Sequence, residues 1–323
     1  MEGRIFDASG SCFGLPPLLS WDISHGFCSP CDSFEVRFLY SPEMLEPLKA
    51  ACRFTAVHEN ETVFRGVADE LELLADPQGC TAVLRGRGLQ ALLMDSEAES
   101  ADYLNADAAF ILAHHVTPLG ITELDRQGVL PGKKATLSVS SGESHWSVLS
   151  RYAEFCLGLR PRFRPDGTLV LDGGDSGRLL RIGKDTPVGV QRYVQDRYGV
   201  LSEVLVKNRV LGTAVTVENA PFQAMGGRCG RVVNVPRHTG FDAMRHTGKY
   251  QIEKSMAGLE SCRVTLPWLF AAFPGDRVLL EDTPLGISGM FRTEASRCTA
   301  GGSAAQTVLT LCPDRRETDY VVI

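Results

Sequence analysis

A histidine and two cysteines near the start of the chain form the closest group of residues that could do chemistry. His25, Cys28 and Cys31 are near neighbours, and the two cysteines have the one-turn spacing of a metal-binding or redox pair. A structural zinc site needs four ligands, and the sequence has no second pair of this kind. We therefore expect no metal and no other cofactor. The segment is interpreted as an ordinary loop, with a metal or redox pair as the alternative.

A second candidate is the segment 174–177, Gly-Asp-Ser-Gly, which matches the nucleophile segment of trypsin-like serine proteases. Ser176 would need a histidine base and an aspartate that orients it. The upstream His114 and His115 lie in a helical pattern without that family's surrounding residues. We interpret the segment as a turn and expect no catalytic residue, so the chain is not expected to be an enzyme.

Other short patterns do not complete a site. His114 and His115 are adjacent, so on a helix their side chains point about 100° apart and do not easily face one metal ion. The segment 128–134 is one residue short of a phosphate-binding loop and lacks the Ser or Thr after its lysines. The segment 85–88 lacks the third glycine of a dinucleotide fingerprint. No nucleotide site is expected.

Residues 141–149 resemble the start of a LysM-type glycan-binding module, in which a short strand precedes an amphipathic helix. Trp146 is then either a sugar platform or the residue that anchors the helix to its core. We favour the core anchor. Peptidoglycan binding or hydrolysis is kept as the alternative function.

Composition narrows the class of protein. The 323 residues are 44% hydrophobic and 22% charged, with a formal net charge of -6. This charge argues against specific nucleic-acid binding, which normally needs a basic excess. The sequence shows neither a signal peptide nor an apolar run long enough to span a membrane. Dispersed glycines and prolines, 32 and 17 in number, favour short strands and frequent turns.

Hydrophobic spacing then predicts the elements. Residues 32–40 alternate between apolar and charged side chains, as in a half-buried strand, and 51–58, 62–68 and 80–85 supply three more strands. Helices are predicted near 106–113, from Ser144 to a stop at Gly158, and over 244–259; a Pro-Asp-Gly hairpin is predicted at 162–171. Strands return at 204–207, 213–217, 262–266 and 277–280. The predicted fold is mainly β with an α+β middle.

Two segments far apart in the chain share a pattern. Phe64-Arg65 is followed by a turn and Val83-Leu84, and Phe291-Arg292 by a turn and Val308-Leu309. This spacing predicts two similar β domains that flank the middle one.

The order of these features resembles the baseplate hub proteins of contractile phage tails. This group includes the late control protein D family and the hubs of Mu-like and PBSX-like prophages. The resemblance rests on residues 34–40, on Val63 to Asp69, and on the segment from Val83 through Arg85-Gly-Arg to Ser96. The later helix, the hairpin and the strand entry at Pro274 to Val278 also fit.

The resemblance implies two tube-like β-barrel domains, 1–100 and 186–323, flanking a smaller α+β domain at 101–185. It further implies a homotrimer that forms a ring of approximate sixfold symmetry, within a virion or tail-like particle assembled in the bacterial host cytoplasm. The implied partners are the tail tube or tube initiator, the trimeric cell-puncturing spike, and baseplate wedge and tape measure proteins. We expect the paired segments to lie at the subunit interface, with Phe64, Val67, Phe291 and Thr293 as contact residues.

Overall fold

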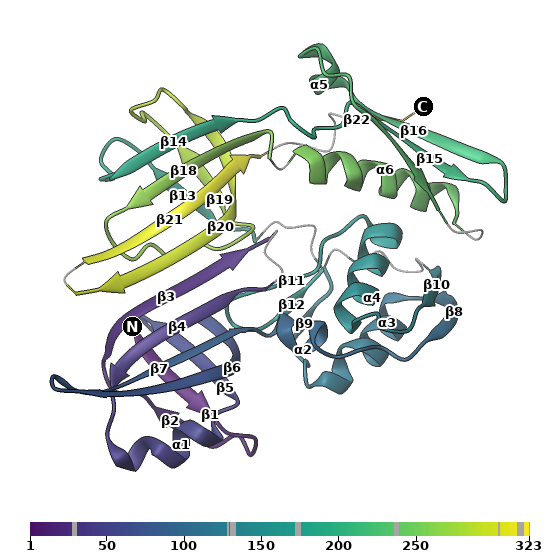
Figure 1. Ribbon diagram of the computed structural model, residues 1–323. Helices are drawn as coiled ribbons and strands as arrows, with labels where there is room; N and C mark the ends of the chain where they lie inside the picture. Colours follow the sequence, from purple (N-terminus) through teal and green to yellow (C-terminus); the bar gives the residue numbers. More distant parts are fainter. Residues whose placement is uncertain are drawn as a thin grey trace.

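The computed structural model describes residues 1–27, 31–127, 129, 134–171, 176–235, 239–256, 258–302, 304–314 and 320–322. Within them the chain is mainly β, as predicted, and its largest sheet has 13 strands. Figure 1 shows this sheet, with a single short helix beside it, on one side of the molecule and the other helices on the opposite side.

The first β unit is built from residues 2–88. Its strands are β1 (Glu2–Phe6), β2 (Cys12–Gly14), β3 (Leu18–Gly26), β4 (Ser33–Leu39), β5 (Arg53–His58), β6 (Glu61–Asp76) and β7 (Gly79–Gly88). A short helix, α1 (Leu45–Ala50), precedes β5. The alternation predicted for β4 is confirmed, because Phe34, Val36 and Phe38 are buried in one core while the residues between them face away.

The second β unit is assembled from two separated stretches. It contains β13 (Leu179–Ile182), β14 (Val190–Gln195), β18 (Glu260–Leu266), β19 (Arg277–Leu280), β20 (Gly289–Gly301) and β21 (Ala304–Pro313). Its core includes Cys262, Val264, Val278, Phe291 and Leu309.

The two β units have the same strand order. Across the sheet, the first unit runs β1-β5-β6-β7-β4-β3 and the second runs β13-β19-β20-β21-β18-β14. With β2 left out, because it pairs only with β1 at the end of the sheet, both orders, ranked along the chain, place the first strand beside the fourth, followed by the fifth, sixth, third and second. One pairing differs in direction, since β1 is antiparallel to β5 whereas β13 is parallel to β19. The duplication predicted from the two Phe-Arg segments therefore extends over six strands.

A middle module follows the first β unit. It contains α2 (Gln90–Met94), β8 (Ala101–Ala106), α3 (Ala108–His115), β9 (Leu124–Asp125), β10 (Ala135–Val139), α4 (His145–Tyr152), β11 (Arg162–Phe163) and β12 (Leu169–Val170). The Ser144 hydroxyl accepts a hydrogen bond from the Ser147 amide and so begins α4. After a π-helical turn at Ala153–Leu157, Gly158 ends the helix with φ of 69°, at the predicted position.

An inserted module interrupts the second β unit between β14 and β18. It contains β15 (Glu203–Asn208), β16 (Thr213–Asn219), α5 (Ala220–Ala224), β17 (Gly230–Asn234) and α6 (Phe241–Met256), and β22 (Tyr320–Val322) completes its sheet. Gly248 lies where α6 crosses this sheet, and a Cβ atom there would come within 2.4 Å of Val217 Cγ2. The glycine thus lets the helix approach the strands closely.

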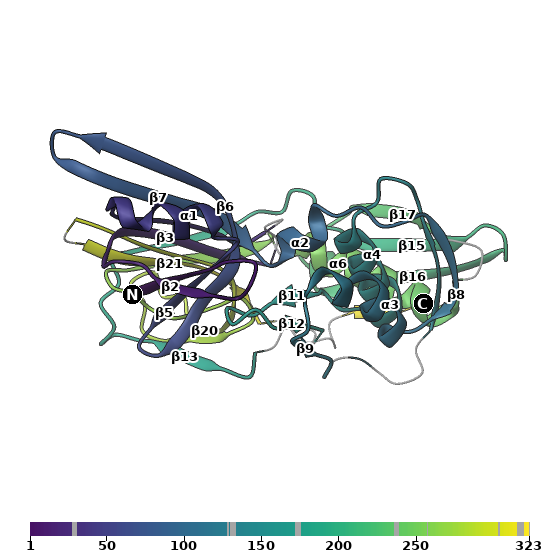
Figure 2. The same cartoon turned by 90° about the horizontal axis from the view of Figure 1, so that it is seen from below.

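Both modules lie at the same end of the β units, whereas the tip of the long β6–β7 hairpin lies at the opposite end (Figures 1 and 2). The modules contact each other through Gln251 of α6, whose Nε2 donates to Glu154 Oε1 at 3.3 Å. Arg65 of β6 ties the first β unit to the middle module, since its Nη1 lies 3.0 Å from Glu123 Oε1. No helix of the described residues is both long and apolar enough to cross a membrane.

Candidate subunit interface

The four residues predicted as interface contacts are packed inside the chain. Phe64 is 1% exposed and lies against the rings of Phe34 and Phe54, while Phe291 is 6% exposed within the second core. Val67 and Thr293 are also buried. Arg65 and Arg292 point to the opposite face from their phenylalanines, as strand alternation requires. A contact between subunits at these strands would therefore involve the backbone edges and the outward residues.

The long strands β6 and β20 are built alike around these residues. Each forms a hairpin with the next strand through a two-residue turn, closed by Asp76 opposite Gly79 and by Gly301 opposite Ala304. Each also carries a β-bulge at the same distance from that turn, between Ala68 and Glu70 in β6 and between Thr293 and Ala295 in β20. A bulge bends its strand and increases the local twist. At the bulge β20 leaves β19 and pairs with β3, whereas β6 leaves β5 and, among the described residues, gains no new strand on that side.

This register corrects one detail of the predicted duplication. Val83 and Val308 occupy equivalent positions, as proposed from the sequence. Counting back from the turns, however, Phe291 is equivalent to Gly66, and Phe64 to Gly289. The two phenylalanines lie two residues out of register on the same inward face, so sequence matching selected the nearest similar residue rather than the structural equivalent.

The two β units join through β3 and the second half of β20. These strands pair antiparallel from Gly26 opposite Ala295 to Ser20 opposite Gly301, and we call this pairing the internal seam. On the outer face of the sheet, away from the cores, Arg297 Nε donates to Asp22 Oδ1 at 2.9 Å. The equivalent edges, β14 of the second unit and residues 70–76 of β6 in the first unit, have a strand on one side only among the described residues.

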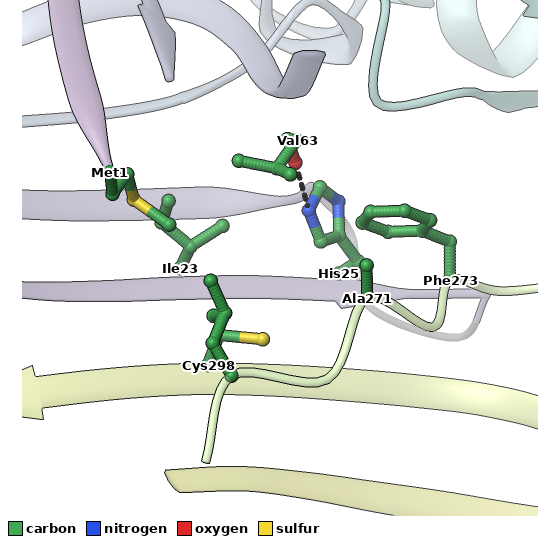
Figure 3. A pocket seen from close by; sticks show the side chains of 8 residues that line it. Met1, Ile23, His25, Val63, Ala271, Phe273 and Cys298 are labelled. Atoms are coloured by element: carbon green, nitrogen blue, oxygen red, sulfur yellow. Dashed lines mark hydrogen bonds between the residues drawn. The ribbon is translucent and has the colours of Figure 1, made fainter. Parts of the chain in front are cut away.

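An apolar hollow lies beneath the internal seam. Ile23, His25 and Cys298 line it from β3 and β20, and Val63, Phe273 and Met1 lie around them (Figure 3). The His25 Nε2 atom lies 3.0 Å from the Val63 carbonyl oxygen, and Nδ1 lies 3.2 Å from Asp32 Oδ2. Both ring nitrogens are therefore engaged within the chain.

Of the two cysteines proposed as partners of His25, only Cys31 lies in the described residues. Burial raises the pKa of the Cys31 thiol to about 12, so the thiolate that a metal requires is disfavoured. Its sulfur lies 3.5 Å from the Gly88 carbonyl oxygen. Cys28 lies outside the described residues. In the part of the chain that the structure describes, no three His, Cys, Asp or Glu residues are grouped as metal ligands.

Ser176 is bound to an aspartate rather than to a histidine. Its Oγ donates to Asp276 Oδ1 at 2.6 Å, and Arg178 Nη1 lies 3.3 Å from Asp276 Oδ2. Asp276 is 1% exposed and Ser176 is half-buried, so this hydroxyl binds a buried carboxylate. From the sequence we expected only a simple turn here. Gly174 and Asp175 lie outside the described residues.

The two adjacent histidines differ in environment. His114 is exposed and its ring stacks on Phe110, whereas His115 is buried with Nδ1 at 3.0 Å from Nδ1 of His145. Burial, followed by the neighbouring His145, lowers the pKa of His115 to about 4. Burial also lowers the pKa of His145. This pair was not predictable from local sequence patterns, because its members are thirty positions apart in the chain.

The remaining motifs serve packing. Trp146 packs against the middle core and stacks on Phe163 at 6.3 Å between ring centroids, as expected of a core anchor. Gly86 lies on β7, where a Cβ atom would come within 1.9 Å of the Val67 carbonyl oxygen. It allows close strand packing rather than phosphate binding. Of the lysine-containing segment 128–134, only Val129 and Lys134 are described.

The chain was compared with known protein families, curated proteins and solved structures. No protein-family model matches the sequence, and no curated protein matches it. Several solved structures, however, are similar to this chain. A tail protein from Neisseria meningitidis is 20% identical, with a TM-score of 0.74, and the match covers 97% of this chain and 96% of that one. The 43 kDa tail protein of prophage MuSo2 from Shewanella oneidensis is 16% identical, with the same TM-score and coverage of 97% and 98%.

A more distant match is an Escherichia coli component of the type VI secretion system, described as structurally similar to the T4 bacteriophage tail proteins gp27 and gp5. It is 12% identical, with a TM-score of 0.60, and the match covers 93% of this chain and 74% of that one. The resemblance drawn from the sequence is confirmed at the level of the fold. The chain has the fold of phage tail proteins, over almost its whole length.

Proposed function

We propose that this chain is the structural hub of a contractile phage tail or of a related tail-like particle, where it joins the tail tube to the trimeric spike. The observation that carries this proposal is the shared strand order of the two β units. The fold likeness to phage tail proteins supports it. In this role the chain acts through assembly and not through catalysis.

The duplication suits a protein that connects parts of different symmetry. Three copies, each with two similar β units, present six similar units around one axis, while the whole chain repeats three times. Such a ring can meet a sixfold tube and a threefold spike. The two β units are proposed as its tube-like barrels. Within the division proposed from the sequence, 1–100, 101–185 and 186–323, the third part holds the inserted module and every strand of the second β unit except β13, which lies before residue 186.

The two ends of the β units differ, and we propose that they contact different partners. The middle and inserted modules lie at one end, and the long hairpin tip lies at the other (Figure 1). The tail tube or its initiator would contact one end and the spike the other. Baseplate wedge and tape measure proteins are the remaining proposed partners. We propose that the chain is located in the virion or tail-like particle, which is assembled in the host cytoplasm.

Labelling within the particle tests this function. A peptide tag inserted in the exposed turn at Pro77-Gln78 would be visualised with gold-conjugated antibody on particles opened at the baseplate. The proposal predicts label at the junction of tube and spike. Label along the tube or sheath, or on fibres, would contradict a hub. Untagged particles treated in the same way are the control.

A further inference from the structure

The internal seam has a counterpart that the single chain leaves open. By strand order, β3 corresponds to β14 and β20 corresponds to β6. In the chain, β3 and the second half of β20 are paired. Their counterparts, β14 and residues 70–76 of β6, each have a strand on one side only within the described residues. Their backbone N–H and C=O groups on the other side form two open sheet edges.

The register identifies equivalent residues on these edges. Matched from the hairpin turns, Glu72 of β6 corresponds to Arg297 of β20. By the same count, Arg85 of β7 corresponds to Thr310 of β21. On the next strand of each unit, Glu35 of β4 lies opposite Arg85, and Arg263 of β18 lies opposite Thr310. Glu35 in turn lies opposite Asp22 of β3, and Arg263 lies opposite Arg192 of β14. Arg192 therefore corresponds to Asp22.

The ion pair of the internal seam is thus reversed in sign on the open edges. Asp22 and Arg297 bind each other in the chain. Their equivalents are Arg192 and Glu72, which carry the opposite charges at the same two positions. A seam with the same geometry would again bring an arginine and a carboxylate together, with the acidic and basic strands exchanged.

Neighbouring charges strengthen this complementarity. On β14, Arg192 lies directly opposite Arg263 of β18, and neither forms an ion pair within the described residues. On β6, Glu70 and Glu72 share Arg85 with Glu35, so three carboxylates surround one guanidinium. Two β14 edges would repel each other, as would two β6 edges, whereas unlike edges attract. Pairing of unlike edges is heterologous, and it closes into a ring when the rotation permits.

Apolar side chains on the two open edges also favour pairing between them. Leu73 is 40% exposed on the core-facing side of β6, at the position equivalent to the buried Cys298. Tyr193 of β14 is equivalent to the buried Ile23. Across a seam in the internal register, Leu73 and Tyr193 would lie directly opposite each other and cover this exposed surface.

We propose that β14 of one copy pairs antiparallel with residues 70–76 of β6 in the next copy, in the register of the internal seam, with Arg192 bound to Glu72. This inference rests on the ring proposed above and names the edges and the partner, a second copy of the chain. It gives a continuous sheet around the ring, in which internal and external seams alternate.

Charge reversal tests the ion pair. Arg192→Glu alone and Glu72→Arg alone should each raise the dissociation constant of the assembly about tenfold or more, because like charges then face each other. The double variant should return to within about threefold of the unmodified protein. Glu46→Arg, on the exposed surface of α1, is the matched control and should have little effect. Sedimentation equilibrium of the purified full chain provides the measurement.

Cysteine cross-linking is a second test, which addresses the register of the seam. Glu72→Cys and Val194→Cys would lie directly opposite across the proposed seam and should form chains linked in twos and threes under mild oxidation. Glu72→Cys with Tyr193→Cys, one residue out of register and on the other face, is the control. We expect the first pair to form more cross-linked product than this control. In the separate charge-reversal experiment, we expect the double variant to restore assembly.

The outcomes separate the seam from the function. A trimer that forms without the 72–194 cross-link overturns the seam and leaves the hub proposal standing. Cross-linking without rescue by the double reversal contradicts the Arg192–Glu72 pair. A chain that stays monomeric even with its spike protein contradicts both the ring and the seam.

Discussion

Arg297 of β20 donates two hydrogen bonds from Nε and Nη2 to the carboxylate of Asp22 on β3, although 275 residues separate them. The pair lies on the outer face of the internal seam, where the sheet passes from one β unit to the other. The equivalent positions on the open edges carry the reversed charges, because Arg192 corresponds to Asp22 and Glu72 to Arg297.

Removing this pair should weaken the internal seam modestly. Asp22→Asn is expected to lower the free energy of unfolding by about 0.5–1 kcal/mol, since Arg297 is mostly exposed and water screens the interaction. Urea denaturation at low and high salt measures the effect, which should shrink in high salt. Arg4→Gln, which removes an exposed pair with Glu2, is the control. An equal or larger effect in the control would mean that Asp22 adds nothing specific to the seam.

The buried histidine pair predicts acid sensitivity in the middle module. The pKa of His115 lies near 4 in the folded chain, mainly because of burial, against an ordinary value of 6.5. The unfolded chain therefore takes up a proton at a higher pH than the folded chain. The stability contributed by the neutral ring is complete above about pH 6.5 and is lost as the pH falls toward 4, by up to about 3 kcal/mol.

Urea denaturation between pH 7.5 and pH 4.5 checks this dependence. His115→Gln should flatten the pH dependence, whereas His114→Gln, at the exposed neighbour, removes only a lesser cause of the lowered His115 pKa and should change the dependence much less. A steep pH dependence that persists in His115→Gln would assign it to other groups.

Ser176→Ala should reduce stability without affecting assembly. The variant leaves one oxygen of the buried Asp276 carboxylate without its hydroxyl donor, at a cost of about 1–3 kcal/mol in the free energy of unfolding. Ser9→Ala, on an exposed loop, is the control. Thermal unfolding and incorporation into tail particles are the two measurements. Normal folding combined with loss of killing or infectivity would restore the interpretation of Ser176 as a nucleophile.

Gly248→Ala should destabilise the inserted module although alanine favours helices. The added methyl group would meet Val217 at 2.4 Å, so we expect a loss of about 1–3 kcal/mol. Val217→Ala combined with Gly248→Ala should cost less than the two single changes added together, because the smaller side chain makes room. Additive losses in denaturant titrations would show that α6 does not press on Val217.

Local patterns predicted the elements whose alternation or capping lies within a few residues. The strand β4 and the helix that begins after Ser144 are examples, because burial and hydrogen bonding follow from neighbouring side chains. The strand β3 has the same alternation, with Trp21, Ile23 and His25 on one face, but its polar residues concealed it.

Long-range pairing was not predictable from local patterns. The partner of β14 is β18, beyond the inserted module, and nothing in Val190–Gln195 specifies a strand so distant along the chain. The residues of the proposed seam were likewise not predicted from the sequence. The bulge at Thr293 and Ala295 sets the register of β20, and a bulge leaves little trace in composition. The sequence therefore matched Phe64 with Phe291 and missed Glu72 and Arg192.

The molar mass of the purified chain in solution tests the hub account most directly. Light scattering should give three times the mass of one 35.2 kDa chain, either for the protein alone or after its spike protein is added. Electron micrographs of that species should show a ring of approximate sixfold symmetry. A stable dimer, a hexamer of identical contacts, or a monomer that the spike protein leaves unchanged would contradict the account.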